Sequence, residues 1–308
     1  MKNINKYLLC LCIVLFTSCV SMNRNIKSLR QDTWTGRFAT MFYSVNAKKT
    51  DSIYLKNPTK NELKLLQKDM NFIVTQIRKN ERVLVENFNE QPLDGLSVIV
   101  ENNEFPNMWA ICSEKKVKIT TGLIRIIFSK AFQMNFSREK ILSFSSLTKS
   151  NRNTNPDNDL FSFLNILYNG KLKKVKLLSL DLDDEGFNSM GVFADLQQTI
   201  SFADNELIKI LIFLISHEFY HLNTNCVNCD NLNKKIEIDA DLYGLLQYSK
   251  FNNSDILTET FFEDFAGRSL PQILNSIYSD IVIPGECYLP IDKRVMMLDS
   301  TLTNLKGN

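Results

Sequence analysis

A helical pattern is the first strong signal along the chain. Thr59 and Glu62 have the spacing of a capping box, in which each side chain can bond the backbone of the other residue. Apolar residues then follow at helical intervals and would share one face of a helix: Leu66, Met70, Ile73 and Ile77. The pattern predicts an amphipathic helix that begins near residue 59 and packs one face on a core.

Three short runs between residues 96 and 120 have the composition of strands. Residues 96–100 are apolar and β-branched, and residues 109–112 and 117–120 flank a turn-like stretch, which predicts a hairpin. A small sheet beside helices indicates an α+β fold. We expect a mostly helical α+β domain over residues 59–308, with an insertion at about 130–200.

Residues 207–215 form a long apolar stretch, in which Lys209 is the charged exception. A helix that is apolar on almost every side is buried, and Asp204 or Asn205 would cap its N-terminus. Further helices are expected at 237–248, 256–265, 270–282 and 291–305. In the last of these, Arg294 faces away from the apolar stripe, as a surface arginine does.

The chain has only two histidines, His217 and His221, and both are candidate metal ligands. They form a His-Glu-x-x-His pattern with Glu218. Residues four apart lie on one face of a helix, so both imidazoles can reach one zinc ion. The Glu218 carboxylate would lie beside the metal, where it can take a proton from a water that zinc activates. The alternative is a buried helix whose two histidines each bond a separate core partner.

A catalytic zinc needs a third protein ligand and an open position for water. Glu237, Asp241 and Gly244 would share one face of the next helix. We expect Glu237 to be the third ligand, Asp241 to hold a ligand histidine by its other ring nitrogen, and Gly244 to let the helices approach closely. Asp230 and Asp239 are weaker alternatives for the third ligand. Glu237 and Asp241 could instead belong to a solvated acidic helix face.

These residues resemble the gluzincin metallopeptidases typified by the CAAX-processing endopeptidase, which have periplasmic lipoprotein relatives. The resemblance rests on His-Glu-x-x-His at 217–221 followed by Glu-x-x-Ala-Asp at 237–241. It extends to three further segments: 107–110, 117–123 and 290–295. In the last of these the resemblance implies that Arg294 pairs with an acidic group near the metal, whereas its position on the helix is that of a surface arginine. Leu289 stands where the family has a histidine. The interval between the two motifs is short for the family and the one before residue 217 is long, which leaves substrate and regulation open.

The resemblance implies a zincin-like domain in which a sheet edge beside the zinc helix holds the substrate backbone as an added strand. The segment that matches this strand consists of Asn107, Met108, Trp109 and Ala110. An internal strand without substrate contact is the alternative, because periodicity does not reveal strand order.

The N-terminus has the pattern of an export signal. A basic start and a short apolar run lead to small residues before Cys19, so residues 1–18 would be removed as a signal peptide and Cys19 lipidated. An ordinary secretory cleavage or an uncleaved anchor is the alternative. Residues 19–58 would form a membrane tether and irregular structure. With Val20 next, the resemblance implies an outer membrane location facing the periplasm.

Four cysteines remain after the anchor cysteine, and in an exported protein they suggest disulfides with three possible connectivities. A disulfide between Cys226 and Cys229 would tie down the loop between the two helices that carry the metal ligands. The alternative is a closed structural zinc site formed by His217, His221, Cys226 and Cys229, which would leave Glu218 without a role.

Charge is balanced along the chain: 36 basic and 34 acidic side chains give a formal net charge of +2, so no basic field indicates nucleic acid. We expect an exported, membrane-anchored zinc peptidase of the bacterial cell envelope that cleaves polypeptides as an endopeptidase. Candidates for stabilising the oxyanion are Tyr243, Tyr248 and Arg294. The alternative is a non-catalytic envelope lipoprotein that uses the same scaffold for binding or assembly.

Overall fold

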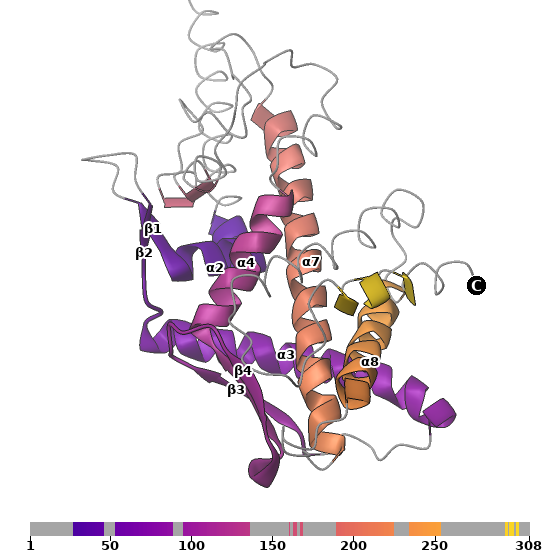
Figure 1. Ribbon diagram of the computed structural model, residues 1–308. Helices are drawn as coiled ribbons and strands as arrows, with labels where there is room; N and C mark the ends of the chain where they lie inside the picture. The colour runs from indigo at the N-terminus through magenta and orange to yellow at the C-terminus, as the bar shows by residue number, and fades with distance from the viewer. Residues whose placement is uncertain are drawn as a thin grey trace, which may run out of the picture. The chain divides into compact units, whose positions relative to one another are not determined.

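The computed structural model describes residues 27–45, 53–88, 95–135, 189–224 and 234–253, with short stretches at 160, 163–164, 167–168, 293–294, 296–298 and 300–301. Within these residues the fold is mostly helical with two small sheets, which confirms the general α+β class (Figure 1). The chain divides into two compact units: Met1–Asn57 with Asn135–Asp204, and Pro58–Met134 with Asn205–Asn308. None of the described helices is both long and apolar enough to cross a membrane.

The first unit contains helix α2 (Trp34–Phe42) and an antiparallel hairpin of β1 (Tyr43–Val45) and β2 (Ile53–Leu55). The Thr33 side chain caps α2 by accepting a hydrogen bond from an amide of its first turn. Most residues of α2 are buried. Part of the segment 19–58, where we expected a tether and irregular structure, therefore forms regular elements.

Helix α7 (Ser189–Asn223) begins well before the position that the sequence predicts. Asp204 lies inside this helix, and its carboxylate accepts hydrogen bonds from the amides of Trp34 (2.9 Å) and Thr35 (2.6 Å) at the start of α2. The prediction that the helix begins at Asp204 or Asn205 is therefore wrong. A polar residue that is suited to cap its own helix here caps another one.

The second unit begins with α3 (Lys60–Phe88), whose first turn has the predicted capping box. The Thr59 amide donates to the Glu62 carboxylate (2.7 Å), and the Glu62 amide donates to the Thr59 hydroxyl (3.3 Å). The predicted apolar face is fully buried at all four positions: Leu66, Met70, Ile73 and Ile77. This helix therefore supplies one wall of the core.

The sheet of this unit has three strands in the order β3-β5-β4. β3 (Ser97–Glu101) is parallel to β5 (Lys116–Thr120), and β4 (Met108–Ile111) is antiparallel to β5. The 3-10 helix η1 (Cys112–Glu114) joins β4 to β5 in the predicted hairpin, and α4 (Thr121–Asn135) follows β5. Among the described residues, β3 and β4 are thus the two edges of the sheet.

The two edges differ in what faces them. α3 packs along β3, and its Gln67 side chain bonds the strand twice, donating to the carbonyl of Val98 (2.7 Å) and accepting from the amide of Val100 (2.9 Å). Arg78 donates to the carbonyl of Leu96 at the same edge. These side chains occupy the backbone groups that another strand would use, so the β3 edge is closed.

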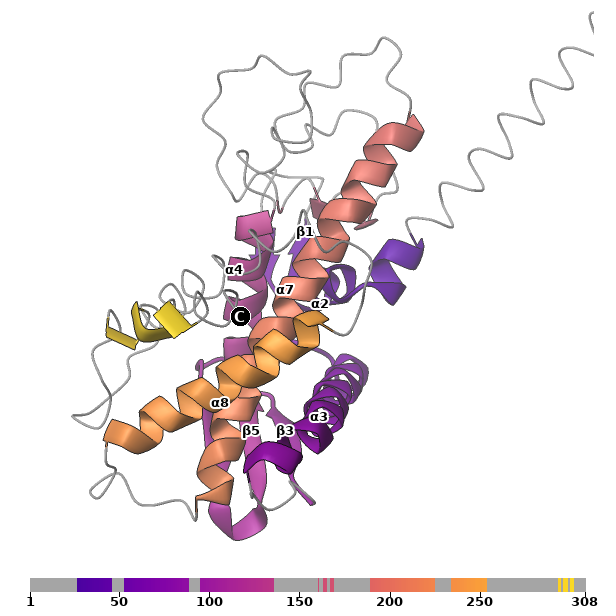
Figure 2. The same cartoon turned by 90° about the vertical axis from the view of Figure 1, so that its right-hand side faces the viewer.

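Helix α8 (Lys234–Asn253) lies across the C-terminal part of α7 (Figure 2). Gly244 makes this crossing possible, because a Cβ atom there would lie only 2.7 Å from the carbonyl oxygen of Phe213. The close approach expected at Gly244 is therefore confirmed. From Leu207 to Phe219 nearly all side chains of α7 are buried, as a helix in the centre of a core requires.

Candidate metal centre

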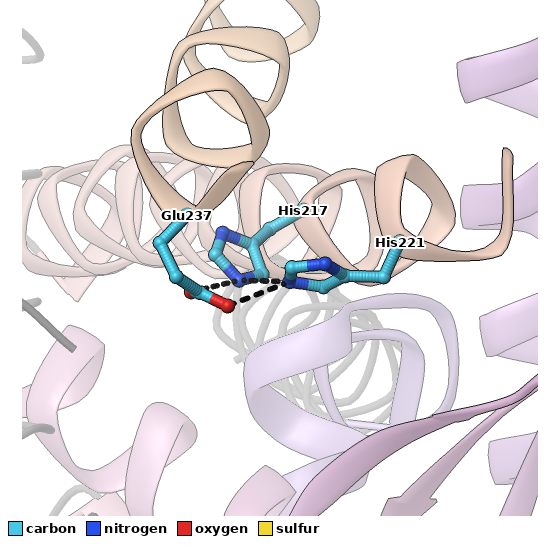
Figure 3. Close-up of side chains that lie close together, drawn as sticks. All are labelled: His217, His221 and Glu237. Carbon is cyan, nitrogen blue, oxygen red and sulfur yellow. Dashed lines mark hydrogen bonds and ion pairs between the residues drawn. The ribbon is translucent and has the colours of Figure 1, made fainter. Parts of the chain in front are cut away.

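Three possible metal ligands meet in the second unit, where α8 crosses the last turns of α7 (Figure 3). The Nε2 atoms of His217 and His221 lie 3.1 Å apart. The Glu237 carboxylate reaches both rings, with Oε2 3.4 Å from His217 Nε2 and Oε1 3.3 Å from His221 Nε2. The structure thus brings together the three residues that the sequence selects as ligands.

The spacing of these atoms suits a single metal ion. Zinc lies about 2.0–2.1 Å from its nitrogen and oxygen ligands, so a tetrahedral site places ligand atoms roughly 3.3 Å from one another. The two ring nitrogens lie 3.1 Å apart, each is 3.3–3.4 Å from a different oxygen of Glu237, and with one ligand atom from each residue the three atoms lie within 4.8 Å of one another. Glu237 Oε2 is buried, and its contact with His217 Nε2 is long, so a metal ion would satisfy it better. The cluster could therefore hold a metal ion.

Asp241 orients His217 from behind. Its Oδ1 atom lies 2.9 Å from His217 Nδ1, which leaves Nε2 directed at the cluster. Arg294 binds the same carboxylate twice, from Nε to Oδ2 (2.8 Å) and from Nη2 to Oδ1 (2.7 Å). Asp241 is fully buried and Arg294 is 2% exposed. Asp241 thus has the expected supporting position, and Arg294 pairs with an acidic group beside the cluster, as the resemblance implies, so the alternative of a surface arginine is wrong.

The charges of the site would be balanced by a divalent cation. Glu218, Glu237 and Asp241 are acidic and Arg294 is basic, which leaves an excess of two negative charges when both histidines are neutral. Without a metal, a proton relieves part of this excess. Burial opposes a charge on His217, but its hydrogen bonds to Asp241 and Glu237 outweigh burial and raise its pKa to about 10.

His221 and Glu218 are shifted toward their neutral forms. Burial and the nearby charge of His217 lower the pKa of His221 to about 4, so its ring is free to bind a metal at neutral pH. Burial raises the pKa of Glu218 to about 7, against the opposing charge of His217. A carboxyl group with a pKa near neutrality can both accept and donate a proton.

Glu218 also connects the cluster to the sheet. It follows His217 on α7, and its carboxylate accepts a hydrogen bond from the backbone amide of Ala110 in β4. The bond shows that the strand passes beside the carboxylate of the His-Glu-x-x-His pattern. Periodicity in the sequence does not reveal this contact, because it depends on the order of the strands.

The strand expected at Asn107, Met108, Trp109 and Ala110 is an edge strand in the described part of the chain. The Thr120 amide bonds the carbonyl of Asn107, so the alternation of an antiparallel ladder turns the backbone groups of Met108 and Ala110 away from β5. Within the described residues the strand is thus not internal. Two side chains take amides of this edge: Asn107 Oδ1 accepts from the amide of Met108 (2.9 Å), and Glu218 accepts from the amide of Ala110.

Close contacts fasten the start of β4 to the end of β5. The Thr120 hydroxyl accepts a hydrogen bond from the amide of Asn107 (2.9 Å) and donates one to its carbonyl (3.1 Å). Gly122 lies so close to the carbonyl of Glu104 that no Cβ atom fits. These contacts supply a packing reason for the residues at 107 and 120–122, which the sequence marks only by resemblance.

The other selected residues are outside the cluster or outside the described residues. The Tyr243 hydroxyl accepts a hydrogen bond from Gln247 (3.3 Å), and the Tyr248 ring faces Lys209. Asp239 takes no part in the cluster. Cys112 is disulfide-bonded. Several predictions concern residues outside the described part of the chain: the signal peptide 1–18, Cys19, Cys226, Cys229, Asp230 and the helices at 256–265 and 270–282.

Comparisons of the chain with models of known protein families, with curated proteins and with solved structures found no match. The function of the site therefore has to be inferred from its own residues.

Proposed function

We propose that the chain is a zinc-dependent peptidase in which His217, His221 and Glu237 bind the metal and Glu218 is the general base. The observation that carries this proposal is the place of Glu218. It follows a ligand on the same helix, has a pKa of about 7 and accepts a hydrogen bond from the amide of Ala110 in the edge strand β4. A purely structural metal site has no need of such a carboxylate. The resemblance to the gluzincin metallopeptidases and their zincin-like domain supports the same reaction class.

A zinc ion in this cluster would supply Lewis acidity, which acidifies a water molecule and polarises a peptide carbonyl. The side chains of the protein perform the remaining tasks. Asp241 holds His217 with Nε2 toward the ligands, and Arg294 keeps Asp241 ionised. Glu218 would accept a proton from the attacking water and deliver it to the leaving amine.

The edge strand β4 supports an extended polypeptide as the substrate. The backbone groups of Met108 and Ala110 face away from β5, and a peptide could add there as a further strand beside Glu218 by replacing the bonds that Asn107 and Glu218 make to the two amides. Binding of this kind uses the peptide backbone and tolerates many side chains. We therefore expect cleavage of unfolded or flexible segments, with endopeptidase activity.

We further propose that the peptidase is exported and anchored to the bacterial cell envelope. The support is the N-terminal sequence, in which a basic start, an apolar run and small residues precede Cys19. A lipid on Cys19 would hold the domain at a membrane surface, and Val20 favours the outer membrane on the periplasmic side.

The first experiment is elemental analysis of zinc in purified residues 20–308 after reconstitution. We expect about one zinc ion per chain, and a sharp loss in Glu237→Ala. Full zinc in Glu237→Ala with loss in Cys226→Ala would instead indicate the closed structural site. A wild-type chain without zinc would end the proposal.

The second experiment tests catalysis with Glu218→Gln. We expect this variant to retain zinc but no longer to cleave a denatured protein mixture. Cleavage is measured by mass spectrometry of the released peptides. The structural reason is that the amide keeps the size of the side chain but cannot take a proton. Zinc binding without cleavage in the wild type, and no defect of the variant in cells, would favour the non-catalytic lipoprotein.

A further inference from the structure

α7 presents one ridge of side chains to α8, and the residues of this ridge lie four apart: Lys209, Phe213, His217 and His221. Such rows are the ridges through which helices pack. Their neighbours on α8 follow in the reverse order: Tyr248, Gly244, Asp241 and Glu237. The metal ligands are thus one end of a longer contact between the two helices, and Lys209 is at the other end.

Lys209 is the unexpected member of this ridge. It is 3% exposed, and its Nζ atom lies 3.8 Å from the carboxylate of Glu206, which is 7% exposed, and 5.9 Å from the centre of the Tyr248 ring. Burial lowers the pKa of Lys209, which shows that the charge is held there at a cost. Apolar residues of similar volume commonly replace a buried ion pair without loss of stability. Stability alone therefore does not explain this lysine.

Two contacts define the register of the two helices. A slide of α8 by one turn would place a residue with a Cβ atom against the carbonyl of Phe213 in place of Gly244, and it would move the Tyr248 ring away from Lys209. A slide of four residues is about 6 Å, which would separate Glu237 and Asp241 from the histidines. Lys209 faces the Tyr248 ring only in the observed register, and a slide would remove this contact.

We propose that Lys209 is a positioning residue, which together with Gly244 sets the register of α8 on α7 and so brings Glu237 and Asp241 level with His217 and His221. Single buried polar groups fix the register of other helical assemblies in this way. The inference rests on the metal centre proposed above, but it does not depend on peptidase activity.

The test removes both charges of this pair in the double variant Glu206→Gln/Lys209→Met. Zinc affinity is measured by competition with a chelator, and stability by urea unfolding of the zinc-free chain. We expect an unchanged or higher urea midpoint together with at least a tenfold loss of zinc affinity. Ile208→Met, a partly exposed neighbour outside the ridge, is the control and should change neither.

A second pair of variants keeps both charges. Tyr248→Phe retains the ring against Lys209 and should bind zinc as the wild type does, whereas Tyr248→Leu should lose affinity at least tenfold. If zinc affinity stays within twofold of the wild type in the double variant and in Tyr248→Leu, the inference is overturned and the pair is structural only. If zinc affinity and the urea midpoint fall together in all variants, the inference is likewise overturned and the pair is structural only. A wild-type chain that binds no zinc would instead refute the metal centre itself.

Discussion

Asp241 receives hydrogen bonds from two sides, one involving His217 and two from Arg294. Its carboxylate therefore decides which ring nitrogen of His217 faces the metal ligands. The arrangement explains why the pKa of Asp241 is about 2: burial alone would raise it, but these bonds stabilise the ionised form.

From this we expect Asp241→Asn to lower zinc affinity by about 10–100-fold, the usual effect of removing the partner of a ligand histidine. An asparagine amide cannot accept bonds at both of its ends, so either His217 or Arg294 would lose its partner. Affinity is measured by competition with a fluorescent chelator. Asp239→Asn, two residues away and outside the cluster, should bind zinc normally; equal loss in both variants would contradict a specific role for Asp241.

The proton on His217 has a consequence for the pH dependence of metal binding. Because its pKa is raised from 6.5 to about 10, the proton stabilises the metal-free chain fully below pH 6.5, and this contribution is lost as the pH rises through about 10. Zinc must displace this proton, whereas His221 is already neutral. Between about pH 7.5 and 9 we expect zinc affinity to rise roughly tenfold per unit, with one proton released. Calorimetry in buffers of different ionisation enthalpy measures the released proton, and a flat profile would contradict the assignment.

At this scale the sequence predicts the ligand set well but the supporting residues only in part. Two histidines and a carboxylate are chemically distinctive, and their helical spacing places them together. Arg294 is indicated only by resemblance, because its partner lies far away in the sequence and its neighbours suggest an exposed position. The contact between Glu218 and Ala110 likewise depends on strand order.

At the scale of elements, the crossing of α7 and α8 depends on Gly244. Alanine normally stabilises a helix relative to glycine by roughly 1 kcal/mol. Here we expect the opposite sign: Gly244→Ala should lower the free energy of unfolding by about 1–3 kcal/mol, because its Cβ atom meets the backbone of Phe213. Urea unfolding measures the change.

Ser249→Ala on the same helix tests whether this effect is local. Ser249 is partly exposed and bonds only the carbonyl of Leu246 among the described residues, so its loss should change the free energy of unfolding by less than about 0.5 kcal/mol. A stabilising effect of Gly244→Ala would mean that the helices are not in tight contact.

Elements with local signals are predictable and those with distant partners are not. The capping box of α3 and the hairpin of β4 and β5 follow from neighbouring residues, and both are present. The start of α7 is missed because Asp204 finds its hydrogen-bond donors at α2, far away in the sequence. The parallel pairing of β3 with β5 has no sequence signal for the same reason.

At the scale of the whole molecule, membrane attachment is separable from the metal site. We expect Cys19→Ala to move the protein from the membrane fraction to the soluble periplasmic fraction of a bacterial host, because one residue would carry the anchor. Immunoblots of the fractions measure the distribution. The purified soluble variant should still bind zinc, and a variant that stays in the membrane fraction would contradict lipidation at this cysteine.

The closed edge at β3 also limits how copies of this protein can associate. A sheet with two free edges can grow indefinitely, but in the described part of this sheet Gln67 blocks one of them. That leaves β4, which could accept a partner by exchanging the bonds that its amides make to Asn107 and Glu218. Two copies joined through β4 would form a twofold pair with no edge left over, and a fibre could not extend from it. In such a pair, β4 of each copy would lie beside Glu218 of the other copy, in the position proposed for the substrate peptide. Self-association through this sheet would thus stop at two and would shield both sites from peptides.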